Sequence, residues 1–282
     1  MSVDEKGLPE FGNPPLCEVA MSVQFEPVDA MRAVHVGLLW NHFREQFPQI
    51  EEQPPLEPVF EQFGGRPTGP VDVTFKLTSG QPPLNRVWFL NADGTQLIQI
   101  QRDRVIHNWR KVGDNDAYPR YEAIRGVFRK ELEVLSKFIG DEKLGEVVPN
   151  QVELSYVDHI APGDGWVSHT DLDRIVTVYR NEFSDPFLGA AEAAELSVRF
   201  VMKNPQGEPL GRLHVHVQPV YRLRDGVPIY LMRLTARGRP AGLDVASVIE
   251  FMDLARAWVV RGFSSITTPA MHTVWQRRDR SS

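Results

Sequence analysis

The chain has 282 residues, 42% of them hydrophobic, and one cysteine, Cys17, so it can bury a core but cannot form an intramolecular disulfide or a multi-cysteine metal site. Its formal net charge of −6 disfavours wholesale binding to nucleic acid or anionic membrane, which normally requires a basic surface. The chain contains neither a signal-peptide pattern nor eighteen consecutive apolar residues, so we expect a cytoplasmic protein without a membrane partner.

The first elements along the chain are a strand and a helix. Leu16 to Phe25 reads as a strand that Pro27 stops, and apolar residues at helical spacing predict an amphipathic helix from Val28 to Phe47, before Pro48. The Pro- and Gly-rich stretch that follows is expected to lie on the surface, with a short strand at Val59 to Phe63. Val71 to Leu77 alternates and predicts another strand.

The clearest strand pattern runs from Arg86 to Lys111. Apolar residues alternate with polar ones, and the turn at residues 91–94 ends in Gly94, which tolerates the positive φ of a tight hairpin. A second turn at Arg102-Asp103 completes an antiparallel meander of three strands with one apolar and one Gln-rich face. A sheet of this kind requires a helix to cover its apolar face.

That helix is predicted from Pro119 to Gly140. One continuous apolar seam is expected to contribute roughly 1.5 to 3 kcal/mol per buried side chain. The seam consists of Tyr121, Ile124, Phe128, Leu132, Leu135 and Ile139.

The second half repeats this order of elements. Val152 to Ile160 predicts a strand, and after an unassigned insert three further strands and a long helix follow. The strands are Leu196 to Met202, Leu213 to Tyr221 and Ile229 to Thr235, and the helix spans Asp244 to Gly262. Thr267 or Thr268 with Pro269 predicts a short last helix.

The predicted architecture is an α+β fold of helix-backed antiparallel sheets, each half running strand, insert, three-strand meander and long helix. The expected divisions are a flexible leader at 1–15, an N-terminal half at 16–145, a C-terminal half at 146–270 and a basic tail at 271–282. Whether the halves are a structural duplication, and whether their sheets are separate or fused, stays open at this point.

Four stretches together resemble a known family: NPPLCEVAMSVQFEP at 13–27, FLNADGTQLIQIQRDRVIHNW at 89–109, VELSYVDHI at 152–160 and FSSITTPAMHTVW at 263–275. The family comprises sporadically distributed bacterial proteins of roughly this length and has no assigned function. The resemblance covers nearly the whole chain and brings no catalytic residues. It implies a scattered accessory bacterial gene, of the kind associated with mobile elements or defence islands.

Histidines form one candidate site. His214 and His216 are two residues apart in a predicted strand, so both imidazoles project from one face and form a two-ligand arm for a transition metal. His159 is the first candidate for a third ligand. The alternative is a solvent-facing pair of polar residues, and since no spacing fixes the remaining ligands we predict no cofactor.

Arginines near the C-terminus form the second candidate site. Tyrosines accompany them, which is typical of single-stranded nucleic-acid binding, although charges on a sheet edge also discourage aggregation. The residues are Arg222, Arg224, Arg233, Arg237 and Arg239.

The motifs that usually open an enzyme site are missing: the sequence contains no HExxH, GxxxxGK[ST], GxGxxG or GxSxG. We therefore predict a non-enzymatic module that binds a macromolecule or associates with itself through an exposed sheet face or edge. The alternatives are a nucleic-acid-binding component of a defence or mobile-element system, and an enzyme or small-ligand or metal-binding protein with its pocket between sheet and helix.

Overall fold

A computed structural model of the chain describes residues 7–64, 84–163, 165–183 and 185–279. Its main element is one antiparallel sheet with the strand order β3-β4-β5-β6-β2-β7-β10-β9-β8. The strands are β2 (Leu16–Phe25), β3 (Gln49–Gln53), β4 (Arg86–Leu90), β5 (Gln96–Gln101), β6 (Arg104–Arg110), β7 (Pro149–Ile160), β8 (Leu196–Lys203), β9 (Pro209–Tyr221) and β10 (Pro228–Gly238). The α+β prediction is confirmed.

The sheet is built from two halves of the same plan. In the first half β2 lies beside β6, the last strand of the meander β4-β5-β6, and in the second half β7 lies beside β10, the last strand of the meander β8-β9-β10. The strands β2 and β7 pair antiparallel at the centre, so the two halves share one sheet. Buried side chains from both halves also belong to a single core.

The meander from β4 to β6 follows the predicted alternation. Phe89, Ile98 and Ile100 are buried on the face that the helices cover, and Gly94 has a φ of 72° in the turn before β5. Glycine adopts a positive φ without steric strain, whereas residues with a Cβ rarely do. Gly94 therefore allows the chain to turn tightly between β4 and β5. The other face carries Gln99, Gln101 and Asn108.

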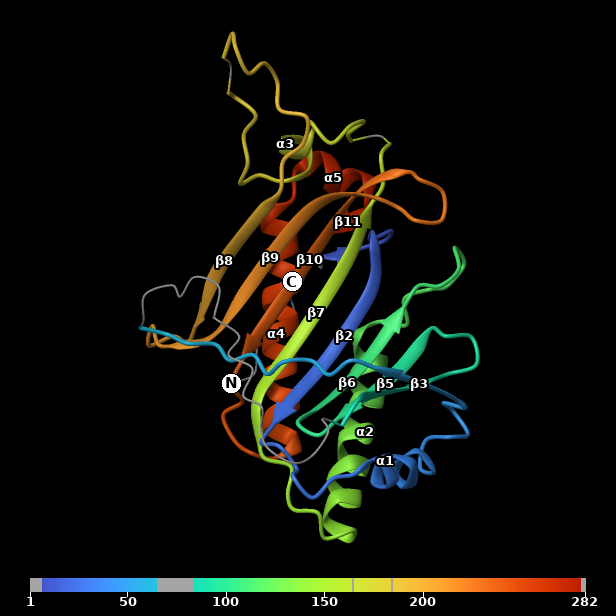
Figure 1. Cartoon of the computed structure of the whole chain (residues 1–282). Coiled ribbons are helices and arrows are strands. Elements are labelled where there is room, and N and C mark those ends of the chain that lie inside the picture. Colours follow the sequence, from blue (N-terminus) through green and yellow to red (C-terminus); the bar gives the residue numbers. More distant parts are fainter. Residues whose placement is uncertain (1–6, 65–83, 164, 184, 280–282) are drawn as a thin grey trace.

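Two long helices, α2 (Tyr121–Asp141) and α4 (Val245–Ile266), cover one face of the sheet (Figure 1). Every residue of the predicted seam of α2 is buried. The two helices are joined by Asp253, which accepts hydrogen bonds from the Tyr121 hydroxyl at 2.7 Å and from two nitrogens of Arg125 at 2.6 Å. Asp244 caps α4 by accepting from the Ser247 N–H at 2.7 Å.

The N-terminal helix is shorter than its apolar spacing predicts. The helix α1 covers only Ala33–Trp40, and single turns replace it from residue 41 to residue 46. The indole N–H of Trp40 donates to the Phe47 carbonyl at 2.8 Å. A side chain, and not a backbone N–H of a further helical turn, therefore satisfies this carbonyl group. The predicted boundaries of 28 and 47 were therefore wrong.

Two strand predictions between residues 54 and 77 have different outcomes. Residues 59–63 do not form the predicted strand, because side chains of the sheet, rather than a neighbouring strand, bind their backbone. The strand predicted at 71–77 lies outside the described residues.

The two ends of the described chain meet. The short strand β1 (Glu10–Phe11) pairs with β11 (Arg277–Arg278), which follows α5 (Pro269–Val274). Leu8 and Phe11 are buried, so these residues of the predicted leader pack against the fold. The remaining helix, α3 (Leu172–Ile175), lies in the insert of the second half. None of the helices among the described residues combines the length and apolarity that a membrane crossing requires.

Candidate functional site

The face of the sheet opposite α2 and α4, here called the open face, carries polar side chains. They project from it because alternate residues of a strand point to opposite faces, and the intervening residues fill the core. Residues 54–64, here called the strap, run across this face from the β3 side towards β9, over the central strands (Figure 1). The strap has no strand partner, so its backbone groups require other bonding partners.

Glutamine side chains of the open face supply those partners. Gln101 on β5 makes a two-way contact with Leu56: its Nε2 donates to the Leu56 carbonyl and its Oε1 accepts from the Leu56 N–H, both at 2.8 Å. Two further glutamines accept strap N–H groups: Gln24 on β2 from Val59 at 2.9 Å, and Gln151 on β7 from Glu61 at 3.4 Å. Three strands thus contribute the same amide chemistry.

Arginines complete the contacts with the strap backbone. Arg104 on β6 donates to the Glu57 carbonyl at 3.1 Å and Arg212 on β9 to the Gln62 carbonyl at 3.1 Å. The guanidinium carbon of Arg212 also lies 4.8 Å from the centre of the Phe63 ring, a cation–π geometry. Both ends of the strap are therefore held by side chains of the sheet.

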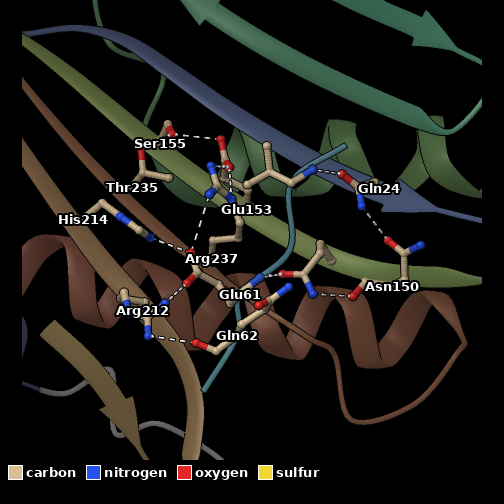
Figure 2. A network of polar contacts seen from close by, with 12 residues as sticks. Gln24, Glu61, Gln62, Asn150, Glu153, Ser155, Arg212, His214, Thr235 and Arg237 are labelled. Atoms are coloured by element: carbon tan, nitrogen blue, oxygen red, sulfur yellow. Dashed lines mark hydrogen bonds and ion pairs between the residues drawn. The ribbon is translucent and has the colours of Figure 1, made fainter. Parts of the chain in front are cut away.

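The Glu61 carboxylate is the main polar anchor of the strap (Figure 2). Only 5% of its side chain is exposed, and it accepts from His214 Nε2 and from Arg212 while Arg237 Nη1 lies 3.5 Å away. Burial alone would raise the pKa of Glu61, but the hydrogen bond from His214 and the charges of His214, Arg212 and Arg237 outweigh it and lower the pKa.

This lowered pKa makes strap docking depend on pH. A carboxylate with a depressed pKa contributes stability above the ordinary pKa of glutamate and loses it as the pH falls through the lower pKa of the docked side chain. The strap is therefore expected to loosen in acid.

A second layer of polar contacts holds these anchors in place. Arg237 donates to Glu153 on β7, which also accepts from the Ser155 hydroxyl at 3.3 Å. Ser155 and Thr235 share a hydrogen bond of 2.6 Å across β7 and β10. These contacts hold Arg237 in place beside the Glu61 carboxylate (Figure 2).

The three histidines predicted as metal ligands occupy different places. His214 binds Glu61, His216 lies two residues further along the same face of β9, and His159 lies on β7, which β10 separates from β9. Within the described ranges, no group of three or more His, Cys, Asp or Glu side chains has metal-binding geometry. The metal assignment stays a prediction.

The five predicted arginines are also divided. Arg237 lies beneath the strap, whereas Arg233 and Arg239 are exposed. Arg222 and Arg224 lie in the β9–β10 turn and form ion pairs with Asp225, and Arg224 also pairs with Asp114. Those two arginines and His159 line one groove at the end of the sheet.

Beside the strap, the described residues leave part of the open face exposed, and this part is basic. In the register of the sheet, His216 on β9 lies opposite Arg233 on β10. His214, its neighbour on this face, lies opposite Arg199 on β8. Burial and then the positive charges of His214, Arg199 and Arg233 lower the pKa of His216. We call Arg199, His216 and Arg233 the basic patch.

Sequence reasoning missed the contribution of the strap and of its glutamines. The Gln-rich alternation at residues 96–101 was a signal for the polar face, and the proline-rich stretch after Gln53 was a signal for an extended segment. Neither pattern indicated that the two would meet. No family model matches this chain, and the search of curated proteins finds no significant match.

Proposed function

We propose that this protein is a non-enzymatic peptide-binding module. Its open face would bind an extended, acidic, proline-rich segment, supplied within the chain by the strap and between chains by a protein partner with a segment of the same character. The observation that carries this proposal is the set of glutamines on β5, β2 and β7 that bind the strap backbone.

Amide side chains that bond to a backbone N–H or carbonyl recognise an extended peptide irrespective of its side chains. Gln101, which bonds to both groups of Leu56, offers the same donor and acceptor that a strand edge would offer. Specificity would come from the pocket of Arg212, His214 and Arg237, which fits one carboxylate. The ligand is therefore expected to contain a Glu or Asp.

The strap itself has the properties of an exchangeable ligand. Its apolar side chains contribute little burial, since Val59, Phe60 and Phe63 are 40%, 51% and 37% exposed. Pro54, Pro55 and Pro58 restrict the free segment to extended conformations, which lowers the entropic cost of binding. A segment held mainly by side-chain hydrogen bonds can open locally without unfolding the sheet.

The test is direct binding of a labelled peptide with the sequence of residues 54–64. Residues 54–62 of the protein are replaced by a glycine-serine sequence of the same length, which vacates the open face. This variant is expected to bind the peptide, whereas the native chain binds it much more weakly because its own strap competes at high effective concentration. Fluorescence anisotropy at pH 7 measures both affinities.

Matched controls test the two parts of the contact separately. Exchanging Glu61 for glutamine in the peptide, or Arg212→Ala in the vacated protein, is expected to weaken binding about tenfold or more, since each removes a charge-assisted hydrogen bond. Gln101→Ala tests the backbone contact, and Arg224→Ala in the β9–β10 turn serves as the neutral control. A folded vacated variant that does not bind the peptide would reject the proposal.

The basic patch favours a second candidate function, binding of single-stranded nucleic acid. Arg233 and Arg199 are exposed and form no ion pair within the described part of the chain. If phosphates bind there, Arg233→Glu is expected to weaken binding of a labelled oligouridine and to reduce the slope of log affinity against log salt by about 0.7 or more. Titrations between 50 and 200 mM salt measure this slope, and equal slopes in both proteins would reject the patch as the site.

A further inference from the structure

On the other side of the sheet, a cavity of about 290 Å³ lies between β7, β10 and the two long helices, and residues 8–11 and Pro14 line its remaining side. Its polar and charged lining residues are Glu10, Tyr118, Arg120, Tyr121, Glu122, Tyr156, Asp158 and Arg256. The volume is at the lower end of the range for ligand pockets and corresponds to a small organic molecule. The peptide-binding face does not include any part of this cavity.

Asp158 is the unusual group of the cavity. It is only 3% exposed, it projects from the helix-covered face of β7, and within the described residues its side chain forms no hydrogen bond or ion pair. Burial without a compensating partner raises the pKa of Asp158 to about 8. Buried carboxylates are normally paired, so an unpaired one that lines a cavity requires an explanation.

The tyrosines of the cavity and one of its arginines already have partners. The hydroxyls of Tyr118 and Tyr156 share a hydrogen bond of 3.1 Å, and the Tyr121 hydroxyl donates to Asp253 at 2.7 Å. Arg256 forms an ion pair with Glu122 and lies over the Tyr121 ring at 4.5 Å. Asp158 is thus a buried carboxyl group of the lining that has no partner among the described residues and that a ligand can still bind.

From these observations we propose that the cavity binds a small organic amine, with its ammonium group on the Asp158 carboxylate and its apolar body between the tyrosines and α4. A cation compensates a buried carboxylate most effectively, and aromatic faces stabilise an ammonium group further. The charges of the lining agree, since three carboxylates, Asp158, Glu10 and Glu122, accompany two guanidinium groups. This site is independent of the peptide-binding proposal.

The experiment uses the full chain and four primary amines of fragment size, including 2-phenylethylamine, each paired with the alcohol of the same skeleton. Saturation-transfer NMR and calorimetry are expected to detect the amines, with affinity rising roughly tenfold per pH unit between pH 6 and pH 7.5 as the carboxyl loses its proton. The other ionisable groups that face the cavity are Glu10, Glu122, Arg120, Arg256, Tyr118, Tyr121 and Tyr156, and Cys17 lies close to Asp158. The burial that raises the pKa of Cys17 to about 12 and that of Tyr118 to about 12 keeps these two protonated over this range.

Asp158→Asn separates the amine site from these other groups. The variant keeps the shape of the side chain, and its fold is verified by circular dichroism. It is expected to lose at least tenfold in amine affinity, to lose the pH dependence and to leave weak alcohol binding unchanged. Calorimetry in two buffers is expected to show release of about one proton per amine bound at pH 6.5 in the native chain and none in the variant. If no amine binds in an Asp158-dependent way, or if affinity falls with rising pH, the proposal is wrong.

Discussion

Glu131→Ala is expected to destabilise the fold by about 3 to 5 kcal/mol, because it removes one partner of a buried polar pair. Glu131 on α2 lies beneath the sheet with 5% of its side chain exposed, and its two carboxylate oxygens are 2.9 and 3.0 Å from Nδ1 of His107 on β6. The other ring nitrogen of His107 is buried and has no partner in the described part of the chain. Without Glu131, the imidazole would lose its remaining hydrogen bond inside the core.

Two further variants distinguish the pair from simple loss of volume. Glu131→Gln retains an acceptor for Nδ1 and is expected to cost less than Glu131→Ala, whereas the double change His107→Leu with Glu131→Leu removes both polar groups and is expected to recover most of the loss. Urea unfolding followed by circular dichroism measures all four proteins. A double variant as unstable as Glu131→Ala would contradict the pairing argument.

Asp158→Asn is expected to make the folded chain more stable than the native sequence by several kcal/mol at pH 8, with little difference near pH 4. The pKa of the buried Asp158 is raised to about 8, whereas in the unfolded chain it is about 3.9. Between these values the unfolded chain has released this proton and the folded chain retains it. Each rise of one pH unit therefore favours unfolding of the native sequence by about 1.4 kcal/mol.

The asparagine variant removes this contribution, so the difference in free energy of unfolding between the two proteins is expected to grow from pH 4 to pH 8 and then level off. Denaturant titrations at four or five pH values measure it. Glu133→Gln, at a carboxylate that is 50% exposed on α2, serves as the control, and its effect on the free energy of unfolding is expected to be small because the side chain is solvated. A constant difference for Asp158→Asn would show that its carboxyl titrates normally in the folded chain.

Local patterns in the sequence were sufficient to predict most of the elements. Alternation from Arg86 to Lys111 predicted β4, β5 and β6, and the apolar spacing after Pro119 predicted the buried seam of α2. These predictions succeed because each element buries one continuous face. Apolar residues therefore recur along its sequence with the period of a helix or a strand. The boundaries of α1 failed, since the Trp40 bond to Phe47 closes the helix through a contact that periodicity does not report.

The candidate site depended much more on tertiary structure. His214 and Arg237 were recognised as functional candidates, but their common partner is Glu61, which lies 153 residues before His214 in the chain. Gln24, Gln101 and Gln151 are similarly unremarkable polar residues of three strands until the sheet order brings them beneath one segment. Contacts between distant residues leave no periodic trace in either segment.

The sequence by itself therefore determined the α+β class, the order of most elements and the polar character of one sheet face. Each of these properties follows from which residues of a single strand or helix are buried and which are exposed. Only the tertiary structure decided that the halves share one sheet, that the strap occupies its open face and that Asp158 is buried without a partner among the residues that the structure describes. These three features depend on how strands from different halves pair. The antiparallel register of β2 with β7 determines which residues of the two halves lie opposite each other at the centre of the sheet.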